Sequence, residues 1–189
     1  MFKDLVLKSR SYRRFDESYE IDTKTLVDLV ALARTAPTTV NSQALKFKII
    51  NNREENEKVF KTLHFAGLLK GKGTPVPGER PSAYIIILTD LSIGNDKRFD
   101  DGIAAQTILL GATEMGLGGC MLGSVDRDIL YDEIGIDKNL YSIDLVIALG
   151  KPIENVIITD VDESGSTAYY RDDDGNHYVP KRKLEDLII

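Results

Sequence analysis

Apolar residues recur along the chain in two kinds of spacing, which alternate. Asp22, a residue suited to capping a helix, precedes four apolar residues at helical spacing, namely Leu26, Leu29, Val30 and Ala33. The same reasoning predicts further helices over residues 1–9, 53–63, 100–115 and 126–134. Pro37 ends the helix that follows Asp22, because the residue before a proline is disfavoured in helical geometry.

Short apolar runs between these helices predict strands. The runs cover residues 47–50, 83–88, 120–125 and 143–149, with a further one over 156–159. Residues 83–88 are continuously apolar, which is typical of a central strand covered on both faces. Helices and strands that alternate without an internal repeat predict one layered domain over residues 1–189.

Two segments interrupt this pattern. Residues 66–81 are rich in glycine and proline and predict a long loop, of the kind that often serves as a lid or a binding segment. From Val179 onward a basic run leads into an apolar end. We expect this end to dock onto a partner subunit, since it is too apolar to remain in water.

Composition narrows the classes of partner. The formal net charge of −6 argues against nucleic acid and anionic lipid, so an anion site must be built by clustering cations locally. No apolar run approaches the ~20 residues that span a bilayer, so we expect no membrane segment. Cys120 is the single cysteine, which fits a reducing cytoplasm, and its place in an apolar run predicts a buried side chain.

Two polar segments near the N-terminus carry the candidate chemistry. Residues 10–15 gather cations and a hydroxyl directly after the first helix. Residues 36–43 form a loop of hydroxyl and amide groups directly before a strand. The two together suit a ligand that is anionic at one end and amide-like at the other, as flavin mononucleotide (FMN) is.

Other motifs do not hold. The glycine-rich residues 116–123 fail as a dinucleotide fingerprint, because Met121 stands in place of the third glycine and the segment follows a helix. The acidic start of a calcium loop at residues 160–165 meets Arg171 where a glutamate is required. His64 and His177 have no partner at zinc-ligand spacing, so we expect no metal site.

Four segments in order resemble the nitroreductase family of FMN-dependent oxidoreductases. They are residues 10–15, 36–43, 116–123 and 149–152, followed by the basic tail. The resemblance implies an α+β fold: a three-layer α/β/α sandwich with a mostly antiparallel mixed central sheet. It also implies an interlocked homodimer with two FMN sites at the subunit interface.

The resemblance also assigns roles to residues. Arg10 and Ser11 would hold the FMN phosphate, with Lys181 and Lys183 nearby, and Arg13 would approach the N1/C2 side of the flavin ring. The ring would be reached from the other subunit by Pro37, Thr38, Thr39 and Asn41. The backbone of Gly118 and Gly119 would pass near N5 and O4 of the ring. Taken alone, each group has a plainer interpretation: surface ion pairs, a helix-ending turn, a helix-to-strand turn and a solvated tail.

The implied function is hydride transfer from NADH or NADPH to an electron-poor acceptor, a nitroaromatic or a quinone, by a ping-pong cycle without a catalytic side chain. The alternative is a flavin-binding protein without turnover, serving as a store or a sensor. A third possibility, an interaction domain, leaves the two polar segments unexplained. Ser9 stands where many members have arginine, and residues 44–45 replace a common Pro-Trp, so the sequence leaves the acceptor open.

Overall fold

The computed structural model describes residues 1–69, 72–94 and 99–189. Its main sheet has the strand order β1 (Phe15–Asp16), β5 (Tyr141–Pro152), β3 (Ala83–Asp90), β2 (Leu45–Ile50), and β4 (Gly118–Leu122) pairs with β5. Every pairing between these strands is antiparallel. β3 is buried over all but its last residue, which confirms the expected central strand.

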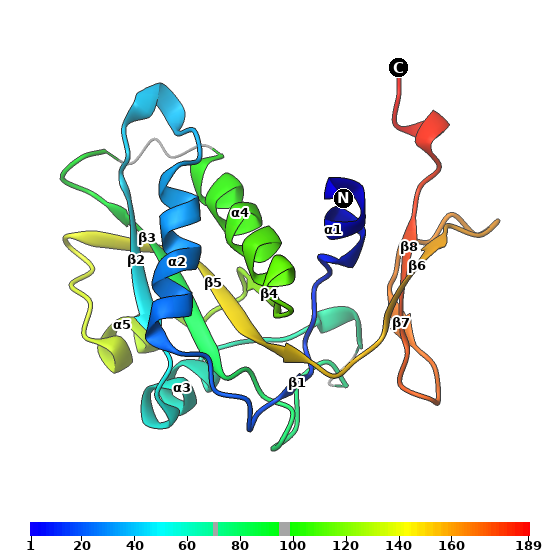
Figure 1. The fold of residues 1–189 in the computed structure, drawn as a ribbon, viewed down its shortest axis with the longest axis horizontal. Helices are drawn as coiled ribbons and strands as arrows, with labels where there is room; N and C mark the ends of the chain where they lie inside the picture. Colours follow the sequence, from blue (N-terminus) through cyan, green and yellow to red (C-terminus); the bar gives the residue numbers. More distant parts are fainter. Residues whose placement is uncertain (70–71, 95–98) are drawn as a thin grey trace.

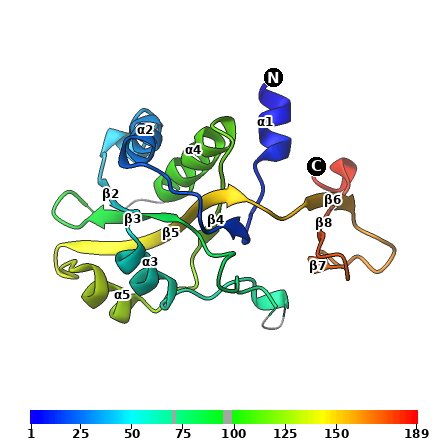
Figure 2. The same cartoon turned by 60° about the horizontal axis from the view of Figure 1, so that its bottom comes forward.

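Helices cover both faces of this sheet (Figures 1 and 2). On one face lie α2 (Thr23–Arg34) and α4 (Asp100–Glu114), and on the other lie α3 (Arg53–Phe60) and α5 (Arg127–Ile134). Each pair of helices shares a buried apolar cluster with the sheet. The expected α+β arrangement in three layers is therefore confirmed.

The sequence explains how α2 and α4 come to lie so close. The Asp22 carboxylate accepts a hydrogen bond from the N–H of Thr25 and caps α2, as predicted. A Cβ at Gly111 of α4 would lie 2.6 Å from Cδ1 of Leu32, so the glycine lets the two helices approach without displacing the Leu32 side chain. Gly116 then ends α4 with a φ of 76°.

A second, three-stranded sheet stands beside the main body (Figure 2). β6 (Val156–Asp160) pairs in parallel with β8 (His177–Lys181), which pairs antiparallel with β7 (Tyr170–Arg171). The sequence predicted only β6. β7 has two residues, and Pro180 lies within β8, so neither gives the apolar alternation that identifies a strand.

Several boundaries differ from the prediction. β4 begins at Gly118 and ends at Leu122, so the strand expected over residues 120–125 lies nearer the N-terminus. α3 ends at Phe60, three residues early. α1 (Phe2–Lys8) buries no residue within the chain, and its apolar residues Phe2 and Val6 are exposed.

The loop over residues 66–81 contains a 3₁₀ helix at Gly67–Leu69, and its residues 70 and 71 lie outside the described part. Across the described ranges, no helix combines the length and apolar character that a bilayer crossing requires.

Candidate functional site

A cleft of about 360 Å³ opens between the segment that follows α1, the helix α4 and the second sheet. Four residues predicted for one site line it together, namely Arg10, Ser11, Arg13 and Lys181. The cleft also contains Gln106 and Leu109 of α4, Tyr169, which directly precedes β7, and His177 of β8. Lys183 does not line the cleft: it is exposed at the start of a 3₁₀ helix (Leu184–Asp186).

The two cleft arginines are held in place but keep unused donors. Arg10 donates from Nη2 to the carbonyl of Val6 (2.6 Å), and its buried Nε has no partner. Arg13 donates from Nη1 to the carbonyl of Ser11 (3.2 Å), and its buried Nε also has no partner. Because a buried N–H without an acceptor is costly, these atoms indicate where a ligand would supply acceptors.

Glu154 joins the arginine segment to the second sheet. Its carboxylate accepts the backbone N–H groups of Arg13 and Arg14 and the guanidinium of Arg171 (2.7 Å), and its side chain is 1% exposed. Burial alone would raise the pKa of Glu154. The His177 ring beside the carboxylate, the hydrogen bond from the N–H of Arg13, and the charge and hydrogen bond of Arg171 outweigh that effect and hold the pKa at about 2. The residue is therefore a fixed anion at neutral pH.

His177 and Tyr169 form the wall of the cleft that faces Arg13. Nδ1 of His177 lies 3.7 Å from Oε2 of Glu154, and neither ring nitrogen has a hydrogen bond although the residue is 1% exposed. The His177 ring meets Tyr169 edge-on, with centroids 5.4 Å apart, and the guanidinium carbon of Arg13 lies 5.2 Å from the Tyr169 centroid.

These wall residues were not predicted. His177 was considered only as a metal ligand, and neither Glu154 nor Tyr169 was singled out. For His177 a signal exists, because it opens a short run with Tyr178 and Val179 that is typical of a strand. No comparable signal marks Glu154, since its partners come from segments far apart in the sequence.

Gly118 and Gly119 lie in β4 and attach the arginine segment to the sheet. Ser11 forms a parallel bridge with Gly119, and the N–H of Tyr12 donates to the Gly119 carbonyl (3.0 Å). A Cβ at Gly119 would lie 2.4 Å from the carbonyl oxygen of Ala148, and one at Gly118 would lie 2.5 Å from the Tyr12 ring. The helix-to-strand turn, the alternative interpretation of these two glycines, is instead at Gly116. Cys120, the next residue of β4, is buried as predicted.

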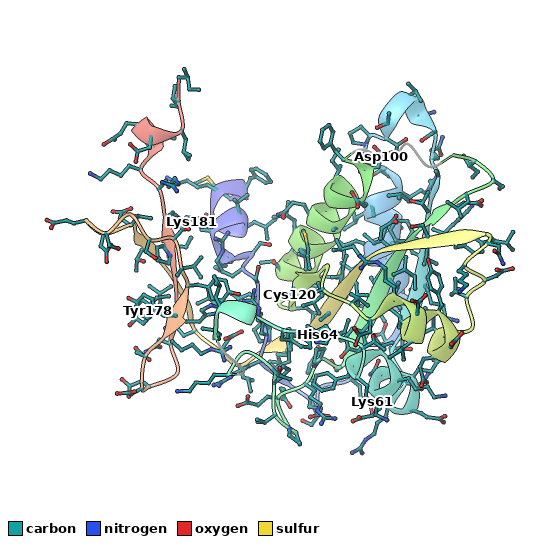
Figure 3. All side chains as sticks on the ribbon, turned by 180° about the vertical axis from the view of Figure 1, so that it is seen from behind. Lys61, His64, Asp100, Cys120, Tyr178 and Lys181 are labelled. Atoms are coloured by element: carbon teal, nitrogen blue, oxygen red, sulfur yellow. The ribbon has the colours of Figure 1, made fainter. Side chains whose placement is uncertain are left out.

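The second predicted group lies elsewhere. Pro37 and Thr38 line a separate cavity of about 300 Å³ between α2, β2 and α4, and Thr39 donates from N and Oγ1 to Asp100 (2.8 and 2.9 Å). In Figure 3, Asp100 and Lys181 lie far apart, with the body of α4 and α1 between them. Within one chain, the loop and the cleft are therefore not parts of one site.

The loop itself has a strained backbone. Val40 and Asn41 have φ values of 48° and 55°, and Val40 is 93% exposed. A β-branched residue at positive φ is a rare outlier, and such strain is concentrated at functional segments.

Comparison with known proteins decides the family. Residues 6–75 and 80–151 match the model of the nitroreductase family. The chain belongs to the nitroreductase family. The match includes the arginine segment, the loop, β4 and nearly all of β5. It does not include the later part of the chain, which forms the second sheet and supplies Tyr169, His177 and Lys181 to the cleft.

Two curated members of the nitroreductase family are distant relatives of the chain. YdgI of Bacillus subtilis, named as an NAD(P)H nitroreductase, is 22% identical over 183 residues, which cover 79% of this chain and 88% of YdgI. A Methanothermobacter thermautotrophicus protein, named as an NADH dehydrogenase/NAD(P)H nitroreductase, is 29% identical over 155 residues, covering 77% of this chain and 74% of that protein.

Solved structures share the fold. One from Desulfovibrio desulfuricans, named as a nitroreductase in complex with FMN, has a TM-score of 0.72 at 19% identity and covers 99% of this chain and 94% of its own. CLA-ER, an enone reductase of gut-bacterial fatty acid saturation, has a TM-score of 0.69 at 18% identity, covering 85% and 93%. The likeness to the first extends over the second sheet as well.

Proposed function

We propose that this nitroreductase-family chain binds FMN in the arginine cleft and transfers hydride from NADH or NADPH to an electron-poor acceptor. The observation that carries this proposal is the buried, unpartnered Nε of Arg10 and of Arg13 in one cleft of a protein whose net charge is −6. Cations gathered against the overall charge, with donors left free, fit an anionic ligand. Two relatives are named for NAD(P)H, and one fold relative is named for its FMN complex.

The residues present suit the two ends of FMN. Arg10 and Ser11 would hold the phosphate, and Lys181 adds a third polar group on the same cleft. Arg13 would lie beside the ring, where a guanidinium favours negative charge, while Tyr169 beneath it keeps the guanidinium in place. FMN itself supplies the hydride chemistry when bound. Donor and acceptor would use the same face in turn, in a ping-pong cycle.

The second group of residues fits a homodimer. If Pro37, Thr38, Thr39 and Asn41 contact the flavin, they must do so in the cleft of a second copy, since α4 separates them from their own cleft. Apolar side chains without cover support an interface: Phe2 is 72% exposed, Phe99 75% and Leu184 70%. The C-terminal residues that we expected to dock on a partner belong to this exposed set.

The acceptor is proposed as a nitroaromatic or quinone compound. An enone reductase shares the fold, so conjugated carbonyl compounds should be tested as acceptors together with nitroaromatic and quinone compounds. All of these acceptors are electron-poor π systems. They can take hydride from a reduced ring without a catalytic side chain.

The experiment that tests the proposal is a titration of the purified protein with FMN, in which binding is measured by the quenching of flavin fluorescence. We expect saturation at one FMN per chain, with binding that weakens as phosphate is added as a competitor. A colourless protein that takes up no FMN would overturn the proposal.

A further inference from the structure

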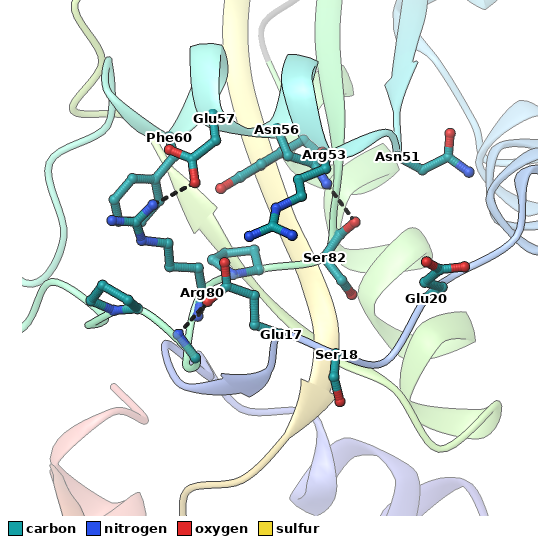
Figure 4. Close-up of a pocket in the computed structure, with 14 residues that line it drawn as sticks. Glu17, Ser18, Glu20, Asn51, Arg53, Asn56, Glu57, Phe60, Arg80 and Ser82 are labelled. Atoms are coloured by element: carbon teal, nitrogen blue, oxygen red, sulfur yellow. Dashed lines mark hydrogen bonds and ion pairs between the residues drawn. The ribbon is translucent and has the colours of Figure 1, made fainter.

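A further cavity, of about 480 Å³, lies apart from the arginine cleft and shares no lining residue with it. It is bounded by one side of α3, by the segment that follows β1, and by the chain that leads into β3 (Figure 4). None of the residues proposed to bind FMN lines it.

Neutral polar atoms without hydrogen bonds line this cavity. They are the hydroxyl of Tyr84, which is 0% exposed, the hydroxyl of Ser82, which is 8% exposed, and Oδ1 of Asn56. Asn56 donates its amide N–H to the Ser82 carbonyl (2.8 Å), which leaves Oδ1 as the free acceptor (Figure 4). Burial raises the pKa of Tyr84, so its hydroxyl remains protonated and can donate.

Buried side-chain polar atoms without hydrogen bonds occur at only two places in the described part of the chain. Over residues 1–69, 72–94 and 99–189, every buried side-chain polar atom without a partner belongs either to the arginine cleft and its Glu154 network or to this cavity. Folded proteins satisfy nearly all buried polar groups, and exceptions of this kind require a partner from outside the chain. A cavity of about 480 Å³ lies in the size range of small-molecule sites, so a ligand as well as water can supply that partner.

The charged groups of the cavity are largely engaged with one another. Arg80 pairs with Glu57 (2.6 Å) and lies over the Phe60 ring at 4.4 Å from its centroid. Glu17 accepts the backbone N–H groups of Gly78 and Arg80. Arg53 and Glu20, the other charged residues of the lining, are exposed to solvent, where an ion pair contributes little. A charged ligand would therefore lose its hydration against the neutral hydroxyls without gaining a buried counter-ion, which is unfavourable.

We propose that this cavity is a second binding site, for a small neutral molecule that presents a carboxamide-type edge. Such an edge offers an N–H to Oδ1 of Asn56 and a carbonyl to the hydroxyls of Tyr84 and Ser82. Phe60 and the two prolines at the cavity, Pro77 and Pro81, provide apolar walls for the body of the ligand.

Benzamide is the probe, and benzoate, which has the same ring with a charged end, is its comparator. Calorimetric titration of the full-length, FMN-loaded protein should show benzamide binding, with benzoate about tenfold weaker or more. Tyr84→Phe should weaken benzamide binding by a similar factor and leave the visible spectrum of the flavin unchanged. The spectrum separates this cavity from the flavin cleft, where a stacked aromatic ring would shift the bands.

Tyr131→Phe is the matched control. The Tyr131 hydroxyl donates to the Tyr141 carbonyl (3.0 Å) and accepts from the N–H of Ile143 (2.8 Å), so its loss breaks two existing bonds. We expect Tyr131→Phe to lower the melting temperature and leave benzamide binding intact. Tyr84→Phe should not lower the melting temperature of the free protein, since its hydroxyl has no partner to lose.

Three results would overturn the proposal. One is benzamide binding that survives Tyr84→Phe or does not occur at all. Another is a Tyr84→Phe protein destabilised as much as Tyr131→Phe, which would mean that ordered water already satisfies the hydroxyl. The third is a crystal structure in which a segment of a second copy fills the cavity.

Discussion

Glu154 has more consequence for the proposed site than any single residue predicted from the sequence. Its carboxylate receives hydrogen bonds from the backbone that carries Arg13, and it pairs with Arg171 of β7. Arg171 in turn donates to the Lys72 carbonyl (2.8 Å), so the glycine-rich loop is tied to the same centre. One buried anion thus fixes the relative positions of two walls of the cleft.

The low pKa of Glu154 predicts a loss of stability in acid. A folded-state pKa of about 2 against the usual 4.5 means that the unfolded chain binds a proton more readily as the pH falls below about 5. The stabilisation, on the order of 3 kcal/mol, is fully present above the unfolded-state pKa and is lost toward pH 2.

Urea unfolding of the wild type and of Glu154→Gln at pH 7 and pH 3 measures this contribution. The glutamine variant should be less stable at pH 7 and should lose less stability on acidification, because other carboxylates contribute alike to both proteins. Equal losses in the two proteins would show that Glu154 is not the group responsible.

Arg13 and Arg14 are neighbours with different surroundings, and this difference gives a matched test of the cleft. Arg13 lines the cleft, whereas Arg14 pairs with Glu79 (3.2 Å) outside it. Arg13→Gln should weaken FMN binding roughly ten- to a hundredfold, the loss expected for a charge-assisted hydrogen bond.

Arg14→Gln should leave FMN affinity nearly unchanged, because the partly exposed ion pair of Arg14 with Glu79 lies outside the cleft. Fluorescence titration of both variants provides the comparison, and circular dichroism checks that both are folded. If the two substitutions weaken FMN binding equally, the arginine cleft is not the phosphate and ring site.

Among the elements, those with a strong apolar period were predictable from the sequence, and those defined by partners were not. α2, β3 and β5 follow from their own residues, because capping and periodicity act within the segment. β1 and β7 have two residues each and exist only through pairing with β5 and β8. Their formation depends on tertiary contacts that a local pattern does not contain.

Gly119 gives a prediction at the scale of a strand. A Cβ there would meet the Ala148 carbonyl oxygen, a backbone atom that cannot move aside, so Gly119→Ala should destabilise the protein by about 2 kcal/mol or more. Gly123 has open space around the same position, and Gly123→Ala should change stability by less than about 0.5 kcal/mol. Thermal unfolding monitored by circular dichroism compares them, and equal melting temperatures would contradict the packing described for β4.

For the whole molecule, the sequence predicted only part of the candidate cleft. Arg10, Ser11, Arg13 and Lys181 come together as expected, since they belong to short motifs. Tyr169 and His177 join them through β7 and β8, two strands that were not predicted, and Glu154 holds this part of the chain against the arginine segment. That the loop at residues 37–41 serves a second copy stays a prediction.

Mixing two defective variants tests the homodimer. Arg13→Gln damages the cleft, and Thr38→Glu would place a carboxylate on the loop that we propose enters the partner's cleft. A mixed dimer holds one doubly altered site and one intact site, so re-pairing should restore FMN binding to about a quarter of all sites. The two variants are mixed, unfolded and refolded together, and as a control each variant alone should refold to its own starting level of FMN binding. If the mixture then recovers no FMN binding, each site is built within one chain.

The central claim is that this nitroreductase-family protein uses FMN in the arginine cleft for turnover. The most direct test is to add NADPH, and then NADH, anaerobically to the FMN-loaded protein while the flavin absorbance is recorded. We predict that the yellow bands bleach within the mixing time or over seconds, and that they return when a quinone is added. A flavin that stays oxidised with both nucleotides would contradict the account and would leave a protein that binds FMN as a store or sensor.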